Sequence, residues 1–351
     1  MRFGVLTGGG DSPAINAATR AITLSALEEG HDVVGIRDGW RGAVENKTFK
    51  LTSTAVSGII NLSGTILGTS RTNPFKMDKG PDKVLATFKK HGIDYLIAIG
   101  GDDTLGVAHK LAKHGVKAIG IPQTIDNDLG ETDYAIGFDT SLNFVMDALD
   151  RLRSTAASHS RIIVAEVMGR DAGWLALLGG LAGGADIILI PERPFNMDRV
   201  CASLREAHKK GKRFAIVAVA EGALPEGGHD QVSKTAEIDA FGHIILGGIG
   251  EWVAGEIKKR TEYEVRSIVL GHMQRGGTPT AFDRNLATRY GAAAVIGCLE
   301  GNTDTMVALK GHKIVYVPLE KALRKNRVVD IKTLRETEFF LRVSMRDHLA
   351  F

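Results

Sequence analysis

Two short segments of this sequence carry residue types that could move a phosphoryl group. Pro122–Asp128 reads PQTIDND and lies about twenty residues after Gly100–Thr104, which reads GGDDT. Glycines let backbone N–H groups approach phosphate oxygens, and carboxylates can hold Mg²⁺ or accept a proton. We therefore interpret the two segments as parts of a site for phosphoryl transfer.

Both segments follow apolar runs that have the composition of buried strands. Tyr95–Ile99 precedes the first segment and Ala118–Ile121 precedes the second. A doubly wound α/β sheet places its ligands just beyond the carboxyl ends of its strands. The order of these runs therefore predicts that the two segments share one edge of a sheet.

Further strand-like runs recur along the chain with amphipathic helical patterns between them. This alternation predicts βα units and an α/β fold with mostly parallel sheets. The first helix should begin with Ser12 as N-cap and Pro13 in its first turn, and another should cover roughly Ser141 to Ser154. The remaining predicted strands are Phe3–Thr7, Val33–Ile36, Ile162–Val167, Asp186–Ile190, Phe214–Val219 and Ile268–Leu270.

The composition narrows the class of protein. A chain of 351 residues is long enough for two lobes, and a net charge of +3 without a basic tract gives no argument for nucleic acid or a membrane surface. The only cysteines, Cys201 and Cys298, have no metal-ligand spacing and are expected to be free thiols. No signal peptide or apolar run of membrane-spanning length is present, so we expect a cytoplasmic protein.

A glycine turn, Gly8–Pro13, follows the first predicted strand and opens a helix. This arrangement suits anion binding at a helix N-terminus. The turn does not match G-x-G-x-x-G, and no acidic residue ends the second strand, so a dinucleotide site is disfavoured.

Eight segments in order give the chain a resemblance, over nearly its whole length, to the 6-phosphofructokinase family. They are Gly8–Pro13, Leu67–Arg71, Gly100–Thr104, Pro122–Asp128, Met168–Arg170, Pro191–Glu192, Glu221–Gly222 and Leu270–Gly277. Gly169–Trp174 further resembles the branch that mixes pyrophosphate- and ATP-dependent members. The family fold implies two doubly wound, mostly parallel-sheet lobes with the active site in the cleft. Residues 1–137 plus about 274–323 would form the donor lobe, and 138–273 plus about 324–351 the sugar-phosphate lobe.

The resemblance implies roles for the residues of phosphoryl transfer to the 1-hydroxyl of fructose 6-phosphate. Asp126 matches the general base, and Asp102 matches the carboxylate associated with Mg²⁺. Thr124 and Asp128 match neighbours that hold the transferring group and the acceptor. The remaining matches are Arg170 near the transferring phosphoryl group, Arg71 on the donor phosphates, and Gly10 and Thr104 in the donor loops.

The sugar phosphate is implied to bind a second set of residues. His272 and Arg275 match its phosphate pocket in the same subunit, and Met168, Gly169 and Glu221 match contacts to the sugar. Arg161 and Arg266 match arginines that family members supply from a neighbouring subunit. A homo-oligomer, either dimer or tetramer, is therefore expected.

The phosphoryl donor is the least defined part of this interpretation. The position of Asp103 is typically glycine in ATP users and acidic in pyrophosphate users, so aspartate favours pyrophosphate. Gln123 fits neither pattern, because pyrophosphate users usually carry lysine there and ATP users glycine. Trp40 matches an aromatic residue near the nucleoside subsite, although a tryptophan is as often a packing residue. Pyrophosphate is favoured, and ATP stays the alternative.

The allosteric site of bacterial relatives is only partly matched. Arg20 and Arg153 match two of its arginines, but Leu24 replaces another, and Ser53 or Thr54 stands where a further arginine is expected. With half of its cations missing, this site is expected to bind anionic effectors poorly.

Three rival interpretations stay beside the leading one. The same pocket residues would serve another ketose phosphate, such as sedoheptulose 7-phosphate. A non-catalytic sugar-phosphate sensor would be expected to lack Asp126 or Asp102, and both are present. An NAD kinase or lipid kinase would lack the segment Gly271–Gly277.

Overall fold

The computed structural model describes residues 1–228, 247–330 and 332–337. These residues divide into two compact units. The first contains 1–140 and 275–327, and the second contains 141–228, 247–274 and the described residues from 328 onward. Residues 229–246, 331 and 338–351, all within the predicted sugar-phosphate lobe, lie outside the described part of the chain.

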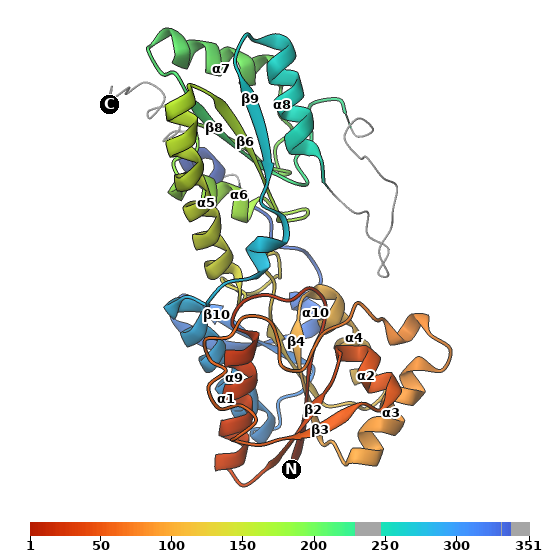
Figure 1. The fold of residues 1–351 in the computed structure, drawn as a ribbon. Coiled ribbons are helices and arrows are strands. Elements are labelled where there is room, and N and C mark those ends of the chain that lie inside the picture. Colours follow the sequence, from red (N-terminus) through yellow and green to blue (C-terminus); the bar gives the residue numbers. More distant parts are fainter. Residues whose placement is uncertain (229–246, 331, 338–351) are drawn as a thin grey trace. The chain divides into compact units, whose positions relative to one another are not determined.

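The first unit is built on a seven-stranded sheet with the order β11-β10-β5-β4-β1-β2-β3 (Figure 1). Five neighbouring strands, from β10 to β2, are parallel, while β3 and β11 pair antiparallel at the two edges. The strands are β1 (Arg2–Thr7), β2 (Asp32–Ile36), β3 (Thr48–Leu51), β4 (Tyr95–Gly100), β5 (Ala118–Pro122), β10 (Thr305–Lys310) and β11 (Lys313–Pro318).

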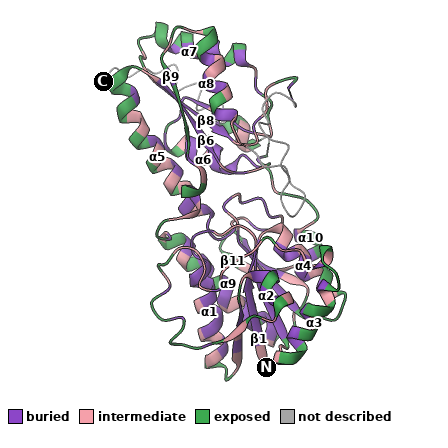
Figure 2. Ribbon diagram, turned by 45° about the vertical axis from the view of Figure 1, so that its right-hand side comes forward, coloured by how far each residue is buried: buried purple, intermediate pink, exposed green. Residues whose placement is uncertain are grey.

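Helices cover both faces of this sheet, and each face has its own hydrophobic core. On one face α1 (Ile15–Glu28) packs beside α9 (Ala281–Leu299), with Ile22 and Tyr290 fully buried. The other face is covered by α2 (Gly39–Glu45), α3 (Gly80–His91), α4 (Asp102–Ala112) and α10 (Leu319–Ala322). A short 3-10 helix, η1 (Pro74–Lys76), precedes α3. The central strands are buried on both sides, as their purple colour shows (Figure 2).

The second unit contains a four-stranded sheet in which every strand pair is parallel, with the order β7-β8-β6-β9. Its strands are β6 (Ile162–Val167), β7 (Ile187–Leu189), β8 (Ala215–Ala220) and β9 (Val265–Val269). The helices that follow or flank them are α5 (Phe138–His159), α6 (Trp174–Ala182), α7 (Met197–Lys209), α8 (Ile249–Arg260) and the 3-10 helix η2 (Gly271–Arg275).

The predicted α/β class with mostly parallel sheets is confirmed. The predicted start of the first helix is wrong. Its N-cap is Ala14, in a left-handed conformation with φ of 71°, and the helix begins at Ile15. Ser12 is buried instead, and its hydroxyl donates to the carbonyl of Ile136 at 3.2 Å, so it fixes the loop rather than the helix end.

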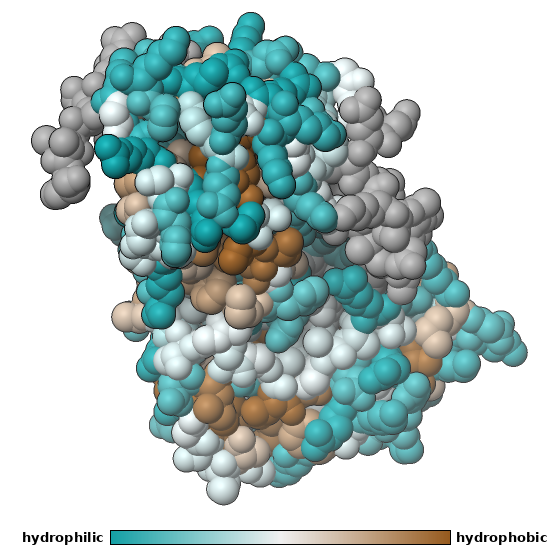
Figure 3. Space-filling model, turned by 45° about the horizontal axis from the view of Figure 1, so that its top comes forward, coloured by the Kyte–Doolittle hydropathy of each residue, from teal (hydrophilic) through white to brown (hydrophobic). Residues whose placement is uncertain are grey.

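The surface is largely polar on the face shown in Figure 3, with scattered hydrophobic patches. Within the described ranges, we find no helix that combines the length and the apolar character needed to cross a bilayer.

Candidate active site

In the first unit, three loops with predicted site residues leave the carboxyl ends of adjacent parallel strands. β4 lies between β1 and β5, and the register pairs Thr7 with Ile99 and Gly100 with Pro122. The strands therefore end at one level, which brings the glycine loop Gly8–Pro13, the start of α4 and the segment Gln123–Asp128 to the same edge of the sheet. This grouping agrees with the prediction from the strand-like runs.

The glycine loop is shaped by close packing against Thr104. A Cβ at Gly8 would lie 2.6 Å from Thr104 Oγ1, and Gly9 has φ of 81°, so neither position accepts a larger residue without strain. Thr104 is only 1% exposed. Its side chain therefore fills the space between the loops, which is a packing role rather than the predicted contact with the donor.

Trp40 does not line the donor site as predicted. Its side chain is completely buried in the core beneath α2 and α4, and its indole N–H donates to the carbonyl of Thr104 at 3.3 Å. A ring with no exposed face cannot stack on a nucleoside. Trp40 instead supports the first turn of α4, where Asp102 and Asp103 lie.

Asp102 and Asp103 begin α4, where negative charge is stabilised by the partial positive charge of the helix N-terminus. Asp102 Oδ1 accepts the backbone N–H of Asp103 at 2.8 Å. No group of three or more His, Cys, Asp or Glu side chains suited to a metal is found in the described ranges. Magnesium in phosphoryl-transfer enzymes is commonly held by one or two carboxylates plus substrate phosphates, and Asp102 fits that kind of site.

The segment after β5 fixes the position of Asp126. Thr124 Oγ1 lies 3.3 Å from Asp126 Oδ2 and accepts the backbone N–H of Asp126 at 3.1 Å. Asn127 follows in a left-handed conformation with φ of 53°, held because its side chain donates to Asp133 O and accepts from Ala135 N–H. Asp128 is 8% exposed, and its carbonyl accepts the backbone N–H of Arg327 at 2.6 Å. The loop therefore presents Asp126 on a backbone that is tied at both sides.

Gln123 and Arg275 both bind the backbone of the glycine loop. Gln123 is 1% exposed and donates from Nε2 to Gly10 O at 3.0 Å. Its buried Oε1 has no hydrogen-bond partner in the described part of the chain. Arg275 donates from Nη1 to Asp11 O at 3.0 Å, so its guanidinium lies beside the predicted donor loop. Arg71, which is predicted to contact the donor phosphates, is exposed.

In the second unit, a further group of predicted residues follows the carboxyl ends of β6, β8 and β9. The register pairs Val167 with Ala220 and Glu166 with Val269, so the following residues Met168–Arg170, Glu221 and His272 come from one edge of this sheet. Glu221 Oε1 accepts the backbone N–H groups of Gly169 at 3.3 Å and Arg170 at 3.0 Å.

Arg170 has two features of a functional residue. Its φ of 55° lies in the left-handed region, which a side chain other than glycine adopts only when its surroundings require it. Its Nη2 is buried without a hydrogen-bond partner among the described residues. A buried guanidinium nitrogen that lacks an acceptor is suited to an anionic ligand.

Arg161 and Arg266 lie at the opposite, amino-terminal edge of the same sheet. Arg161 directly precedes β6, and Arg266 is the second residue of β9. Both pair with Glu264, Arg161 through Nε at 2.9 Å and Arg266 through Nη2 at 2.8 Å. The hydrogen bond and charge of Arg161, with the charge of Arg266, hold the pKa of Glu264 below its usual value. The structure therefore does not bring these arginines together with Met168–Arg170 in one subunit.

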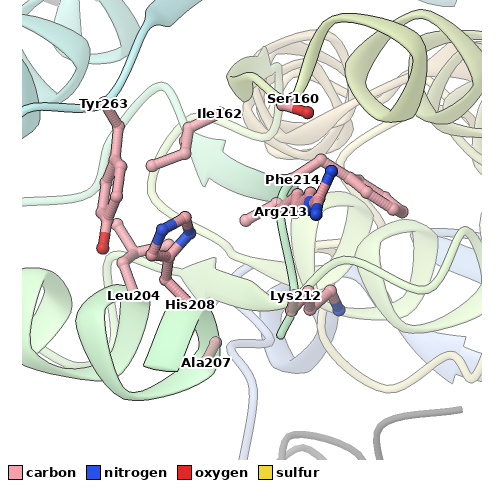
Figure 4. Close-up of a pocket in the computed structure, with 10 residues that line it drawn as sticks. Ser160, Ile162, Leu204, Ala207, His208, Lys212, Arg213, Phe214 and Tyr263 are labelled. Atoms are coloured by element: carbon pink, nitrogen blue, oxygen red, sulfur yellow. The ribbon is translucent and has the colours of Figure 1, made fainter. Parts of the chain in front are cut away.

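A small cavity lies at this amino-terminal edge (Figure 4). Its volume is about 20 Å³, and its lining includes Ser160, His208 and Tyr263. The rings of His208 and Tyr263 lie 4.9 Å apart. A space of this size accommodates a water molecule but no sugar phosphate.

Sequence reasoning missed three residues that position predicted site residues. Gln274 is fully buried and accepts the backbone N–H of Met168 at 3.3 Å. Glu264 joins Arg161 to Arg266, and Thr69 donates to Gly9 O at 2.7 Å. Gln274 and Thr69 lie inside segments that carry the family resemblance, so their position in those segments was a usable signal.

One arginine of the expected effector site is used within the subunit. Arg153 Nη2 donates to the carbonyls of Gly183 and Gly184, each at 2.6 Å. These bonds engage Nη2 of Arg153 within its own subunit. The expected effector site already lacks arginines at other positions, so little positive charge is left there for an anion.

Comparison with known proteins gives consistent matches over the chain. A family model described as Phosphofructokinase matches residues 2–298. The chain is 52% identical over 342 residues to a pyrophosphate--fructose 6-phosphate 1-phosphotransferase of Amycolatopsis mediterranei, covering 97% of this chain and 99% of the relative. It is 46% identical to an ATP-dependent 6-phosphofructokinase of Corynebacterium efficiens, covering 92% of this chain and 94% of the relative.

A solved structure has the same fold. The pyrophosphate-dependent phosphofructokinase of Nitrosospira multiformis superposes with a TM-score of 0.84 at 23% identity, covering 97% of this chain and 91% of the other.

Proposed function

The chain belongs to the phosphofructokinase family, and on that premise we propose that it transfers a phosphoryl group to the 1-hydroxyl of fructose 6-phosphate. The product is fructose 1,6-bisphosphate. The observation that carries this proposal is the position of Asp126, whose backbone N–H is held by Thr124 at the same sheet edge as the glycine loop and Asp102. A base, an anion-binding loop and a metal-associated carboxylate are the groups that phosphoryl transfer needs.

In this reaction Asp126 removes the proton of the sugar 1-hydroxyl as its oxygen attacks the donor phosphorus. Thr124 keeps the carboxylate oriented toward that hydroxyl. Asp128 would help to hold the acceptor. Arg71 and Arg170 supply positive charge to the donor phosphates and the transferring group. Asp102, together with the donor phosphates, would hold Mg²⁺. When bound, the ion neutralises charge on the donor oxygens.

Pyrophosphate is the donor that we favour. The relatives that share about half of their residues with this chain include pyrophosphate-dependent transferases of several bacteria, while ATP-dependent relatives are 43–46% identical. Asp103 adds a carboxylate to the first turn of α4, and a nucleotide would have to pass its α-phosphate near that charge. ATP is the alternative donor.

The sugar phosphate is assigned to the second unit with help from a second subunit. Met168, Gly169 and Glu221 would contact the sugar, and His272 its phosphate, at the carboxyl edge of the β6 sheet. Arg275 is also expected to bind the sugar phosphate. Its hydrogen bond to Asp11 O means that it would in addition support the backbone of the donor loop, as Gln123 does.

Arg161 and Arg266 lie at the other edge of the sheet, which supports the proposal that they serve the site of a neighbouring subunit. The working form would then be a homo-oligomer, dimer or tetramer. A cytoplasmic location and weak control by anionic effectors stay predictions from the sequence.

The decisive experiment is the initial rate with fructose 6-phosphate and Mg²⁺, with pyrophosphate or ATP as sole donor. Turnover with pyrophosphate alone supports the whole proposal. Turnover with ATP alone keeps the reaction but overturns the donor. Sedoheptulose 7-phosphate is run as a second acceptor, and a kcat/KM above that for fructose 6-phosphate would change the assigned substrate. Sugar-phosphate binding without turnover by either donor would indicate a sensor instead of an enzyme.

A further inference from the structure

The backbone of the glycine loop is held by side chains at three consecutive carbonyl groups. Each side chain comes from a different segment of the first unit. The bonds are Thr69 Oγ1 to Gly9 O at 2.7 Å, Gln123 Nε2 to Gly10 O at 3.0 Å, and Arg275 Nη1 to Asp11 O at 3.0 Å.

Holding a carbonyl also fixes the direction of the next N–H. In a trans peptide the C=O and the N–H of the same unit point in opposite directions within one plane, and the structure contains no cis peptide bond among its described residues. With the carbonyls of Gly9, Gly10 and Asp11 bound to side chains, the N–H groups of the three following residues are turned away from those side chains. Backbone N–H groups that point to a common side of a loop can bind an anion.

We call the three side chains that bond the loop carbonyls, Thr69, Gln123 and Arg275, the tethers of the glycine loop. Thr69 differs from the other two because its segment also contains Arg71, which is predicted to contact the donor. Gly9 N–H donates to Ser70 O at 3.3 Å and Gly9 O accepts from Thr69, so both peptide units that flank Gly9 are bonded to the 69–70 segment. The same segment is fixed to the rest of the unit by bonds that leave Gly9 untouched. Thr7 Oγ1 donates to Gly68 O at 2.7 Å, and Ser70 Oγ donates to Asp38 O at 2.6 Å.

We propose that Thr69 is a positioning residue for the phosphoryl donor. Its hydroxyl aims the Gly10 N–H at the donor phosphates and keeps the glycine loop in register with the segment of Arg71. The inference rests on the proposed function for the identity of the anion, since a phosphate-containing donor is what the loop would hold. Thr69 itself does not touch the donor, so its loss should change donor affinity rather than the chemical step.

The test compares Thr69→Val, which replaces the hydroxyl with a methyl group of similar size, with Thr69→Ser, which keeps the hydroxyl. We expect Thr69→Val to raise the KM for pyrophosphate by roughly 3- to 10-fold, the range that corresponds to one hydrogen bond. The KM for fructose 6-phosphate and kcat should stay within about twofold of the wild type. Thr69→Ser should restore the pyrophosphate KM. An unchanged donor KM in Thr69→Val, or an equal rise in both KM values, would overturn the proposal.

A matched control separates this bond from general loosening of the segment. Thr65 lies in the same stretch, and its hydroxyl contacts the N–H of Leu67 at 3.1 Å and Thr7 Oγ1 at 3.0 Å without bonding the glycine loop, so its loss loosens the segment and leaves the Thr69 bond in place. Thr65→Val should therefore leave the pyrophosphate KM unchanged. If it raises that KM as much as Thr69→Val does, the effect comes from the segment as a whole and the proposal is wrong.

Direct binding makes the result independent of turnover. Calorimetric titration of wild type and Thr69→Val with Mg²⁺-pyrophosphate, without sugar phosphate, should show the same 3- to 10-fold weakening. If wild type binds pyrophosphate but turns over no donor, the proposed function fails while the role of Thr69 can still be judged.

A second variant disturbs the glycine loop at a different tether, Arg275. A Cβ at Gly10 would lie 2.5 Å from Arg275 Nη1. Gly10→Ala should therefore displace Arg275 and weaken pyrophosphate binding, whether or not Thr69→Val folds. Unaltered binding in this variant would show that the tethers do not orient the loop.

Discussion

Arg161 and Arg170 are held at opposite ends of β6. Arg161 directly precedes the strand, and Arg170 follows its last residue, Val167, by three positions. A strand of six residues is about 20 Å long. Arg161 is paired with Glu264 at the amino end, whereas Arg170 has its backbone N–H bonded to Glu221 at the carboxyl end. Two arginines expected to bind the same pair of substrates therefore do not meet within one subunit.

This separation predicts complementation between defective subunits. In a homo-oligomer that shares sites, Arg161→Ala damages the neighbour's site and Asp126→Asn damages its own. Co-expression of the two variants should restore activity that neither variant has alone, because some hybrid sites receive both intact residues. Activity is measured on tagged, co-purified hybrids. Hybrids that stay inactive would mean that Arg161 works within its own subunit or not at all.

Asp126→Asn tests the general base while keeping the shape of the side chain. We expect kcat to fall by a factor on the order of 10² to 10⁴, the usual contribution of general base catalysis. The KM for fructose 6-phosphate should change little, because the amide still fits beside Thr124. Asp82→Asn, which changes an exposed carboxylate on α3, is the control and should retain full activity. A decrease in kcat below tenfold would remove Asp126 from the chemical step.

The sequence predicted the arrangement of the loops better than the packing around them. Apolar runs followed by glycine or aspartate predict which segments gather at the carboxyl edge of a parallel sheet, because the βα topology fixes which strand ends meet. Arg161 precedes the strand that Met168 follows, so their separation is also visible in the sequence.

The corrections concern side chains whose surroundings come from distant segments. Trp40 is completely buried and bonds Thr104 O, and Thr104 fills the space beside Gly8. The structure also adds a contact that was not predicted, because Arg275 bonds Asp11 O, 264 residues away in the sequence. Residue type and spacing cannot predict such contacts. The contacts depend on which side chains from distant segments are packed into the same space of the folded chain.

Asp103→Gly tests whether this carboxylate selects the donor. Removing its bulk and charge should raise the ratio of kcat/KM for ATP to that for pyrophosphate by roughly tenfold or more, since two charges about 4 Å apart near a protein surface interact by several kcal/mol. Asp103→Asn removes the charge and keeps the size, so it separates the two effects. Both donors are compared at fixed fructose 6-phosphate and Mg²⁺. A ratio that stays constant in both variants would assign donor choice to another residue.

Asp283 is a buried structural carboxylate for which a pH effect on stability can be predicted. It belongs to α9, is fully buried, and accepts hydrogen bonds from Gly137 N–H at 3.0 Å, Thr140 N–H at 2.8 Å and Thr140 Oγ1 at 2.6 Å. Burial raises its pKa from 3.8 to about 6, because desolvation of the charge outweighs these bonds. Asp283 thereby ties α9 to the beginning of α5.

The sign of the effect follows from proton binding. Between pH 4 and 6 the folded state holds this proton more tightly than the unfolded state, so the contribution of Asp283 to the unfolding free energy falls as the pH rises through that window. The total change is on the order of 3 kcal/mol for a pKa shift from 3.8 to about 6. Asp283→Asn lacks this titration and places an amide N–H₂ against N–H donors, which costs about 1–3 kcal/mol. Unfolding of both proteins is measured from pH 4 to pH 8. We expect the variant to be less stable than the wild type at pH 4 and the gap to narrow toward pH 6, and a constant gap would show that Asp283 does not titrate in this range.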